Sequence, residues 1–238
     1  MCALAHNLEE QGFATVTLAG VRAQAERTRP PRALWTSAPL GRPVGEPDDV
    51  GFQMRVLRHA LGLLERTDGP VILEDFPEDP LGLTDTPEWT PPPGTSTARF
   101  DSAQAWRAAF AAELSALLPL WQAAQARFGR TSVGLSFQDP VAWPDFAAKV
   151  LSGALPIIPL LDTTAVSVRF LCDDIKALYG EAAQAVGPKP SPRQVDTWFW
   201  RATVAGDMLR ALRAAAMESE NNALKTVGGR FFVPAPWV

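Results

Sequence analysis

A proline-rich stretch at residues 76–97 constrains the fold of this 238-residue chain more than any other feature. It reads FPEDPLGLTDTPEWTPPPGTST and contains six prolines. Proline lacks an amide donor and fixes φ, so this stretch cannot form a regular helix or a central strand. It therefore predicts a linker or irregular loop between residues 1–75 and residues 98–238, two regions that differ in hydrophobic periodicity.

Before the linker, helical and strand patterns alternate. This order favours a small parallel sheet with flanking helices. The third helix carries one apolar face, which we expect to be buried and which consists of Val50, Met54, Leu57, Leu61 and Leu64. The spacing predicts helices over 3–11, 21–28 and 50–64, and strands over 13–19, 32–38 and 71–74.

After the linker, the apolar spacing is helical throughout. Asp101 or Ser102 can cap the first helix, and Ser191 followed by Pro192 is typical of a helix start. The apolar tail RFFVPAPWV is expected to pack back on the body. Helices are predicted over 102–128, 145–151, 167–185 and 191–217, so the fold class is α/β in the N-terminal third followed by a mostly α-helical region.

Composition excludes several classes of protein. A net charge of −4 and a pI near 5.3 argue against a nucleic-acid partner. Two cysteines and two histidines are too few for a disulfide framework or a histidine-rich metal site. The sequence contains no apolar run of membrane-spanning length, no secretory pattern and no glycine-rich phosphate loop. We therefore expect a cytoplasmic protein with no membrane partner, metal or cofactor.

Cys2 is the candidate catalytic residue. It lies at the N-terminal end of the first predicted helix, where the helix dipole favours the thiolate. The alternative is an idle thiol in a frayed helix end. The sequence indicates an inert, buried Cys172 and solvated side chains at the other polar candidates, namely His6, His59, Asp173 and Asp174.

A candidate binding loop, PLGRPVGEP, follows the strand predicted over 32–38. Its prolines and glycines make it rigid, and Arg42 can hold a carboxylate or phosphate. Glu74 and Asp75 close the next parallel strand, so they should lie at the same sheet edge. The alternatives are a loop that only redirects the chain and acids that are only solvated. The predicted site for a small zwitterionic ligand comprises Pro39, Leu40, Gly41, Arg42, Pro43, Glu74 and Asp75.

A family resemblance covers residues 1–75. It rests on the segments CALAHNLEEQGFATV, RPPRALWTSAPLGRPVGEP, FQMRVLRHALGLLERT and GPVILED. These resemble the selenoprotein B subunit of the glycine/sarcosine/betaine reductase family, which is related to D-proline reductase. In that family a helix ending in glycine leads to a strand, a PLG-x-P loop and a long helix. The resemblance implies reduction of a C–N bond of a small amine through a selenoether, an amino-acid-like ligand and partner subunits of a reductase complex.

The sequence departs from that family at the redox centre. The family has a run containing selenocysteine or cysteine before the first helix, whereas this sequence has Cys2 and no paired cysteine motif. Three hypotheses stay open. The chain is an oxidoreductase-like homologue that lacks the redox centre or has it upstream. It is a non-catalytic small-molecule-binding or interaction protein of the same fold. Or it is a small-molecule enzyme that uses Arg42, Glu74 and Asp75.

Overall fold

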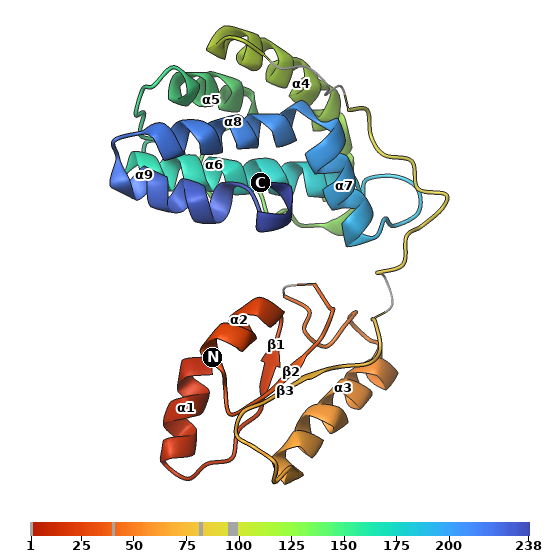
Figure 1. The fold of residues 1–238 in the computed structure, drawn as a ribbon. Helices are drawn as coiled ribbons and strands as arrows, with labels where there is room; N and C mark the ends of the chain where they lie inside the picture. The colour runs from red at the N-terminus through yellow and green to blue at the C-terminus, as the bar shows by residue number, and fades with distance from the viewer. Residues whose placement is uncertain (1, 40, 81–82, 95–99) are drawn as a thin grey trace. The chain divides into compact units, whose positions relative to one another are not determined.

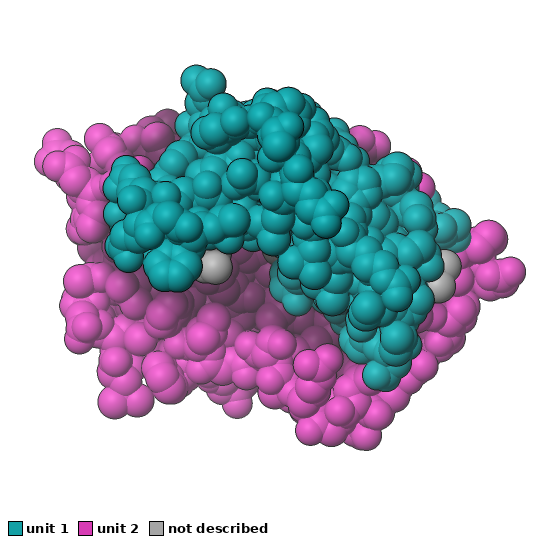
Figure 2. Space-filling view, turned by 90° about the horizontal axis from the view of Figure 1, so that it is seen from below, with its two compact units in different colours: residues 1–85 teal, residues 86–238 magenta. Residues whose placement is uncertain are grey.

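A computed structural model describes residues 2–39, 41–80, 83–94 and 100–238 (Figure 1). The chain divides into two compact units, residues 1–85 and residues 86–238, which Figure 2 distinguishes by colour. Unit 1 contains a small parallel sheet with helices, and unit 2 is helical. This confirms the fold class predicted from the sequence. None of the described helices is both long enough and apolar enough to cross a membrane.

Unit 1 is built on a three-stranded parallel sheet in the order β1-β2-β3. Both crossovers pass through a helix, as the alternating pattern predicts. The strands are shorter than predicted, and Phe13, expected in the first strand, is 60% exposed outside it. The elements are α1 (Cys2–Glu10), β1 (Thr17–Ala19), α2 (Arg22–Thr28), β2 (Arg32–Trp35), α3 (Val50–Gly62) and β3 (Ile72–Asp75).

The two crossover helices pack on opposite faces of this sheet. Ala33 of β2 packs in a cluster with Ala25 of α2. The next residue, Leu34, packs in another cluster with Phe52 and Val56 of α3. Successive strand side chains point to opposite faces, so α2 covers one face and α3 covers the other.

The prediction of which apolar face of α3 is buried is wrong. Val50, Met54, Leu57 and Leu61 are each at least 39% exposed, and Leu64 is half-buried. Both faces of this helix carry apolar side chains, so periodicity alone cannot select the buried one. The sheet selects the face on which the Phe52 ring meets the Phe76 ring edge-on, at 5.6 Å between centroids. The buried residues are Phe52, Val56, Ala60 and Leu63.

Unit 2 packs its helices around α6 in one hydrophobic cluster. Ser191 caps α7, as predicted, and of the two predicted candidates for the cap of α4, Asp101 and Ser102, the structure selects Ser102. Its α-helices are α4 (Ala103–Phe128), α5 (Trp143–Leu151), α6 (Thr164–Ala182), α7 (Pro192–Ala202), α8 (Val204–Glu218) and α9 (Asn222–Val227). Short 3₁₀ turns occur at Pro140–Ala142 and Ala235–Trp237 of this unit and at Leu63–Glu65 of unit 1. A π turn occurs at Gly228–Phe232.

The prediction of a single long helix over 191–217 is wrong, because the helix is interrupted at Thr203. Thr203 has extended backbone angles (φ −118°, ψ 145°), and its side chain accepts a hydrogen bond from the Gly206 amide at 3.0 Å. A Cβ at Gly206 would lie 2.3 Å from the Phe199 carbonyl oxygen. The junction of α7 and α8 therefore requires glycine at position 206.

A buried carboxylate from another helix completes this junction. Glu113 of α4 is 4% exposed and accepts hydrogen bonds from the Val204 amide at 2.8 Å and the Ala205 amide at 3.0 Å. It also accepts one from the Tyr179 hydroxyl at 2.8 Å. Burial, and then the neighbouring Glu113 charge, hold the pKa of Tyr179 well above its usual value, so this hydroxyl stays a donor. A carboxylate at a helix N-terminus stabilises that helix, so Glu113 favours a new helix start at Val204.

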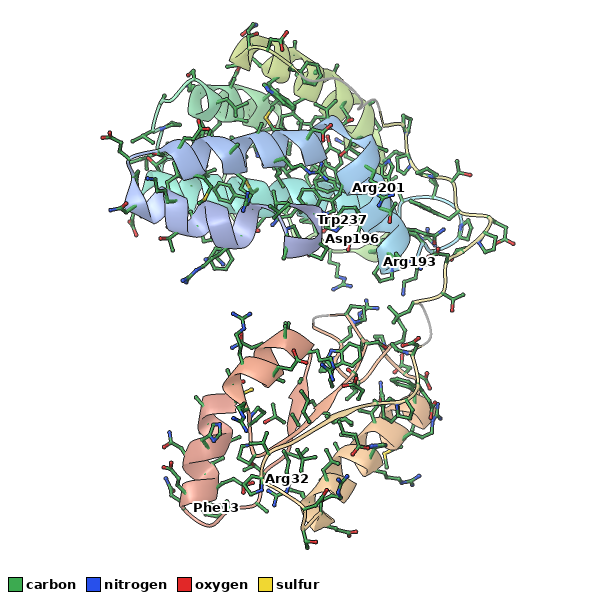
Figure 3. The ribbon with its side chains drawn as sticks, viewed as in Figure 1. Phe13, Arg32, Arg193, Asp196, Arg201 and Trp237 are labelled. Carbon is green, nitrogen blue, oxygen red and sulfur yellow. The ribbon has the colours of Figure 1, made fainter. Side chains whose placement is uncertain are left out.

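The C-terminal tail packs back on unit 2, as predicted from its apolar sequence. Phe232 and Val233 are buried. The Trp237 ring stacks on Trp200 at 6.5 Å between centroids, and its carbonyl accepts a hydrogen bond from Arg210 Nε at 3.0 Å. Figure 3 shows Trp237 beside Arg201 of α7, whose guanidinium lies 5.6 Å from the indole centroid. These contacts hold the tail against α7 and α8.

Replacing Glu113 should destabilise the protein strongly. Glu113→Ala leaves two amides of α8 and the Tyr179 hydroxyl without their acceptor, so we expect a loss of about 3 kcal/mol in unfolding free energy. Urea denaturation followed by circular dichroism measures this loss. Glu88→Ala, at an exposed site of the same unit, should change stability by less than about 0.5 kcal/mol. Equal effects of the two substitutions would contradict the role of Glu113.

The two faces of α3 should respond differently to truncation. Val56→Ala opens space in the core of unit 1 and should cost about 2 kcal/mol. Leu57→Ala removes an exposed side chain and should cost less than about 0.5 kcal/mol. Denaturant melts of the two variants measure both costs. A larger loss of unfolding free energy for Leu57→Ala than for Val56→Ala would indicate that the face predicted from periodicity is the buried one.

Candidate functional site

The candidate site lies at the carboxyl edge of the sheet in unit 1. Residues 34 and 35 of β2 pair in register with Glu74 and Asp75 of β3, so the two parallel strands end together, as predicted. The Ser37 hydroxyl, just beyond β2, donates a hydrogen bond to the Asp79 carboxylate, beyond β3. The segments that follow both strands therefore meet at this edge.

The predicted binding loop is tied to the end of β2. The Thr36 hydroxyl donates to the Pro43 carbonyl at 2.9 Å, and the Arg42 amide donates to the Pro39 carbonyl at 2.9 Å. Gly41 has a φ of +90°, a conformation that favours glycine. Leu40, also predicted for the site, lies outside the described residues. The hydrogen bonds fix the course of the loop around Arg42.

Arg42 keeps donor capacity although it forms an ion pair. Its Nη1 atom donates to both carboxylate oxygens of Glu46, at 2.8 and 2.7 Å. The side chain is 40% exposed. Its Nε and Nη2 groups make no hydrogen bond to any residue that the structure describes. Those two groups form the geometry that binds a carboxylate with two parallel hydrogen bonds.

Glu74 and Asp75 do not point into one cleft, which corrects the sequence expectation. Glu74 contacts His59 of α3 at 2.6 Å and Arg66 Nη1 at 3.1 Å. Asp75 accepts hydrogen bonds from Arg22 Nε of α2 at 2.9 and 3.1 Å. Neighbouring residues of a strand face opposite sides of the sheet, so these two carboxylates are separated by the sheet itself.

His59 is a candidate that sequence reasoning missed, because it was expected to be solvated. Its Nε2 atom contacts Glu74 Oε1, and its ring meets Phe76 edge-on at 5.5 Å between centroids. An ionised carboxylate only accepts hydrogen bonds, so in this contact His59 Nε2 is the donor and Glu74 the acceptor. The two residues lie fifteen positions apart, and no local motif links them.

The two cysteines cannot act as a redox pair. Cys2 begins α1 in unit 1 and is half-buried, whereas Cys172 is fully buried in α6 of unit 2. Burial raises the pKa of the Cys172 thiol to about 12, which makes it unreactive, as the sequence indicates. Both cysteines are free. Within the described ranges, no cluster of three or more metal-ligating side chains occurs.

Asp174 is buried, which corrects the prediction of a solvated acidic face. One of its carboxylate oxygens accepts from the amides of Gly134 and Leu135, at 2.9 and 3.0 Å. The other accepts from the amide and the hydroxyl of Ser136, at 2.8 and 2.6 Å. Its neighbour Asp173 ion-pairs with Lys176 at 2.8 Å. Asp174 therefore anchors a loop and is saturated with internal donors.

No family model, curated protein or solved structure matches this chain. The carboxyl edge of unit 1 is therefore argued from its own geometry. It brings together the loop 39–43, Ser37 and Asp79, and it separates Glu74 from Asp75.

The two thiols should differ sharply in alkylation. At pH 8, a pKa of about 12 leaves about one Cys172 in ten thousand as thiolate, and burial blocks access as well. Iodoacetamide should modify Cys2 of the native protein and reach Cys172 only after urea is added. Peptide mass spectrometry locates the label. Modification of native Cys172 at the rate of Cys2 would contradict its burial.

Proposed function

We propose that unit 1 is a ligand-binding unit related to the reductase B family, and that it binds a small amino-acid-like zwitterion at the carboxyl edge of its sheet. Arg42 binds the ligand carboxylate, and the Asp79 carboxylate pairs with the ligand ammonium group. Arg42 is an element of the predicted site, whereas Asp79 replaces the acids Glu74 and Asp75 in that role. The proposal follows the non-catalytic alternative of the same fold.

The divergence of the chain at this edge supports a ligand site there. After β1 the chain turns to α2 on one face, and after β2 it turns to α3 on the other face. In open parallel sheets, ligands bind beyond the carboxyl strand ends, where neighbouring connections separate in this way.

The free donors of Arg42 are the observation that carries the proposal. Nε and Nη2 have no partner among the described residues, while Glu46 holds the guanidinium in place through Nη1. One carboxylate oxygen of Asp79 accepts a hydrogen bond from the Ser37 hydroxyl, and the second oxygen remains as an acceptor. Hydrogen bonds connect both groups to one turn, since Ser37 and Thr36 are neighbours and Thr36 binds Pro43, next to Arg42.

The chemistry of the thiols favours binding over reduction for these 238 residues. Reductive cleavage of a C–N bond needs two electrons, and a thiol that supplies them needs a second thiol to complete a disulfide. Cys172 is buried in unit 2, so Cys2 has no accessible thiol partner within the described chain. We therefore expect no turnover of glycine, sarcosine, betaine or proline with a dithiol donor.

Calorimetric titration tests the proposal. The parent protein should bind at least one of glycine, sarcosine, betaine and proline, and Arg42→Ala should weaken that binding at least about tenfold, because charge-assisted hydrogen bonds to the carboxylate are lost. Arg55→Ala is the matched control, since Arg55 pairs with Glu78 on the exposed side of α3. Absence of binding to all four ligands, or equal affinity of Arg42→Ala and the parent, would overturn the proposal.

A further inference from the structure

Unit 2 contains a cavity that the proposed function does not use. Its volume is about 410 Å³, which lies within the range of small-molecule sites. The cavity lies where the C-terminal ends of α5 and α8 meet the start of α9, and Figure 1 shows α8 running across the unit to the side on which α9 begins. Its lining includes Val150, Leu155, Ala215, Glu218, Glu220 and Leu224.

The cavity has an apolar floor. Val150 of α5 and Leu224 of α9 are buried, and both belong to the hydrophobic cluster of unit 2. Ala215 of α8 and the exposed Leu155 extend this apolar surface toward the rim. A hydrocarbon body of a few carbon atoms can be removed from water here, which is favourable for each buried CH₂ group.

The charged residues that line the cavity are both acidic. Glu218 and Glu220 lie on its rim, and none of the described lining residues is a lysine, arginine or histidine. Two helices, α5 and α8, also end here, so their negative dipole ends add to the same potential.

The two rim carboxylates are available to a ligand. Neither Glu218 nor Glu220 forms a hydrogen bond or ion pair with any residue in the described part of the chain. The neighbouring polar groups are used internally, because Ser219 Oγ accepts from the Asn221 amide at 3.1 Å and Asn221 Oδ1 caps the Leu224 amide at 3.0 Å. Among the described lining residues, the carboxylates of Glu218 and Glu220 therefore remain available as charged acceptors.

We propose that this cavity binds a small aliphatic cation, a primary amine or guanidine on a hydrocarbon body of about five carbons. The cationic head lies between Glu218 and Glu220, and the hydrocarbon body lies on Val150 and Leu224. Two carboxylates above an apolar floor suit such a molecule better than a metal ion, which needs more oxygen ligands. This site is independent of the carboxyl edge of unit 1.

Titration of the full chain with n-pentylamine, followed by amide NMR shifts, tests this inference. Saturable shifts should appear at residues around Ala215 and Leu224. The double variant Glu218→Gln/Glu220→Gln should weaken binding at least about tenfold, equivalent to about 1.4 kcal/mol. Both positions are exposed and have no partner among the residues that the structure describes, so we expect the variant to fold. Glu88→Gln, an exposed acid of the same unit outside the cavity, is the matched control and should leave the affinity unchanged.

Two further probes separate charge recognition from apolar binding. Pentanoate has a similar hydrocarbon body with an anionic head, and 1-pentanol has a neutral head. Much weaker binding of both than of n-pentylamine supports the inference. It is overturned if n-pentylamine gives no saturable shifts, if either probe binds as tightly, or if the double variant keeps the parent affinity.

Discussion

The carboxylate of Glu113 connects α4 to the first turn of α8 and to the Tyr179 hydroxyl of α6, with three hydrogen bonds of 2.8 to 3.0 Å. The start of α8 at Val204 depends on this interaction, because the carboxylate accepts hydrogen bonds from amides that a helix start leaves unpaired. Asp174 does the same for the loop 134–136. Glu113 and Asp174, the buried acids of unit 2, are therefore structural, whereas Glu218 and Glu220 are exposed at the rim of the cavity.

In unit 1 the charged side chains are placed differently from those of unit 2. Several of the ion pairs of unit 1 are solvent-exposed and hold the end of β3, as in the contact of Arg22 with Asp75 and that of Arg66 with Glu74. Exposed pairs of this kind contribute little to stability. An arginine such as Arg42 can hold one carboxylate through a single nitrogen and still offer two donors to another. For this reason an ion pair at the sheet edge is compatible with a ligand site.

The two proposed sites differ in the charge that they select. The carboxyl edge of unit 1 offers an arginine and an acid to a zwitterion, whereas the cavity of unit 2 offers two acids above an apolar floor to a cation. Each site lies within one unit. A ligand test of one site is therefore informative whatever the outcome at the other.

The sequence by itself determined the division at the proline-rich stretch, the parallel order of strands and helices, and the cap Ser191, because these depend on local backbone chemistry. Only the tertiary structure decided which face of α3 is buried, since both faces are apolar and the sheet selects the one with Phe52. It also decided the break at Thr203, which Glu113 stabilises from ninety-one residues away at Val204. The separation of Glu74 from Asp75 likewise depends on which helix covers each face of the sheet, a long-range contact that local periodicity does not contain.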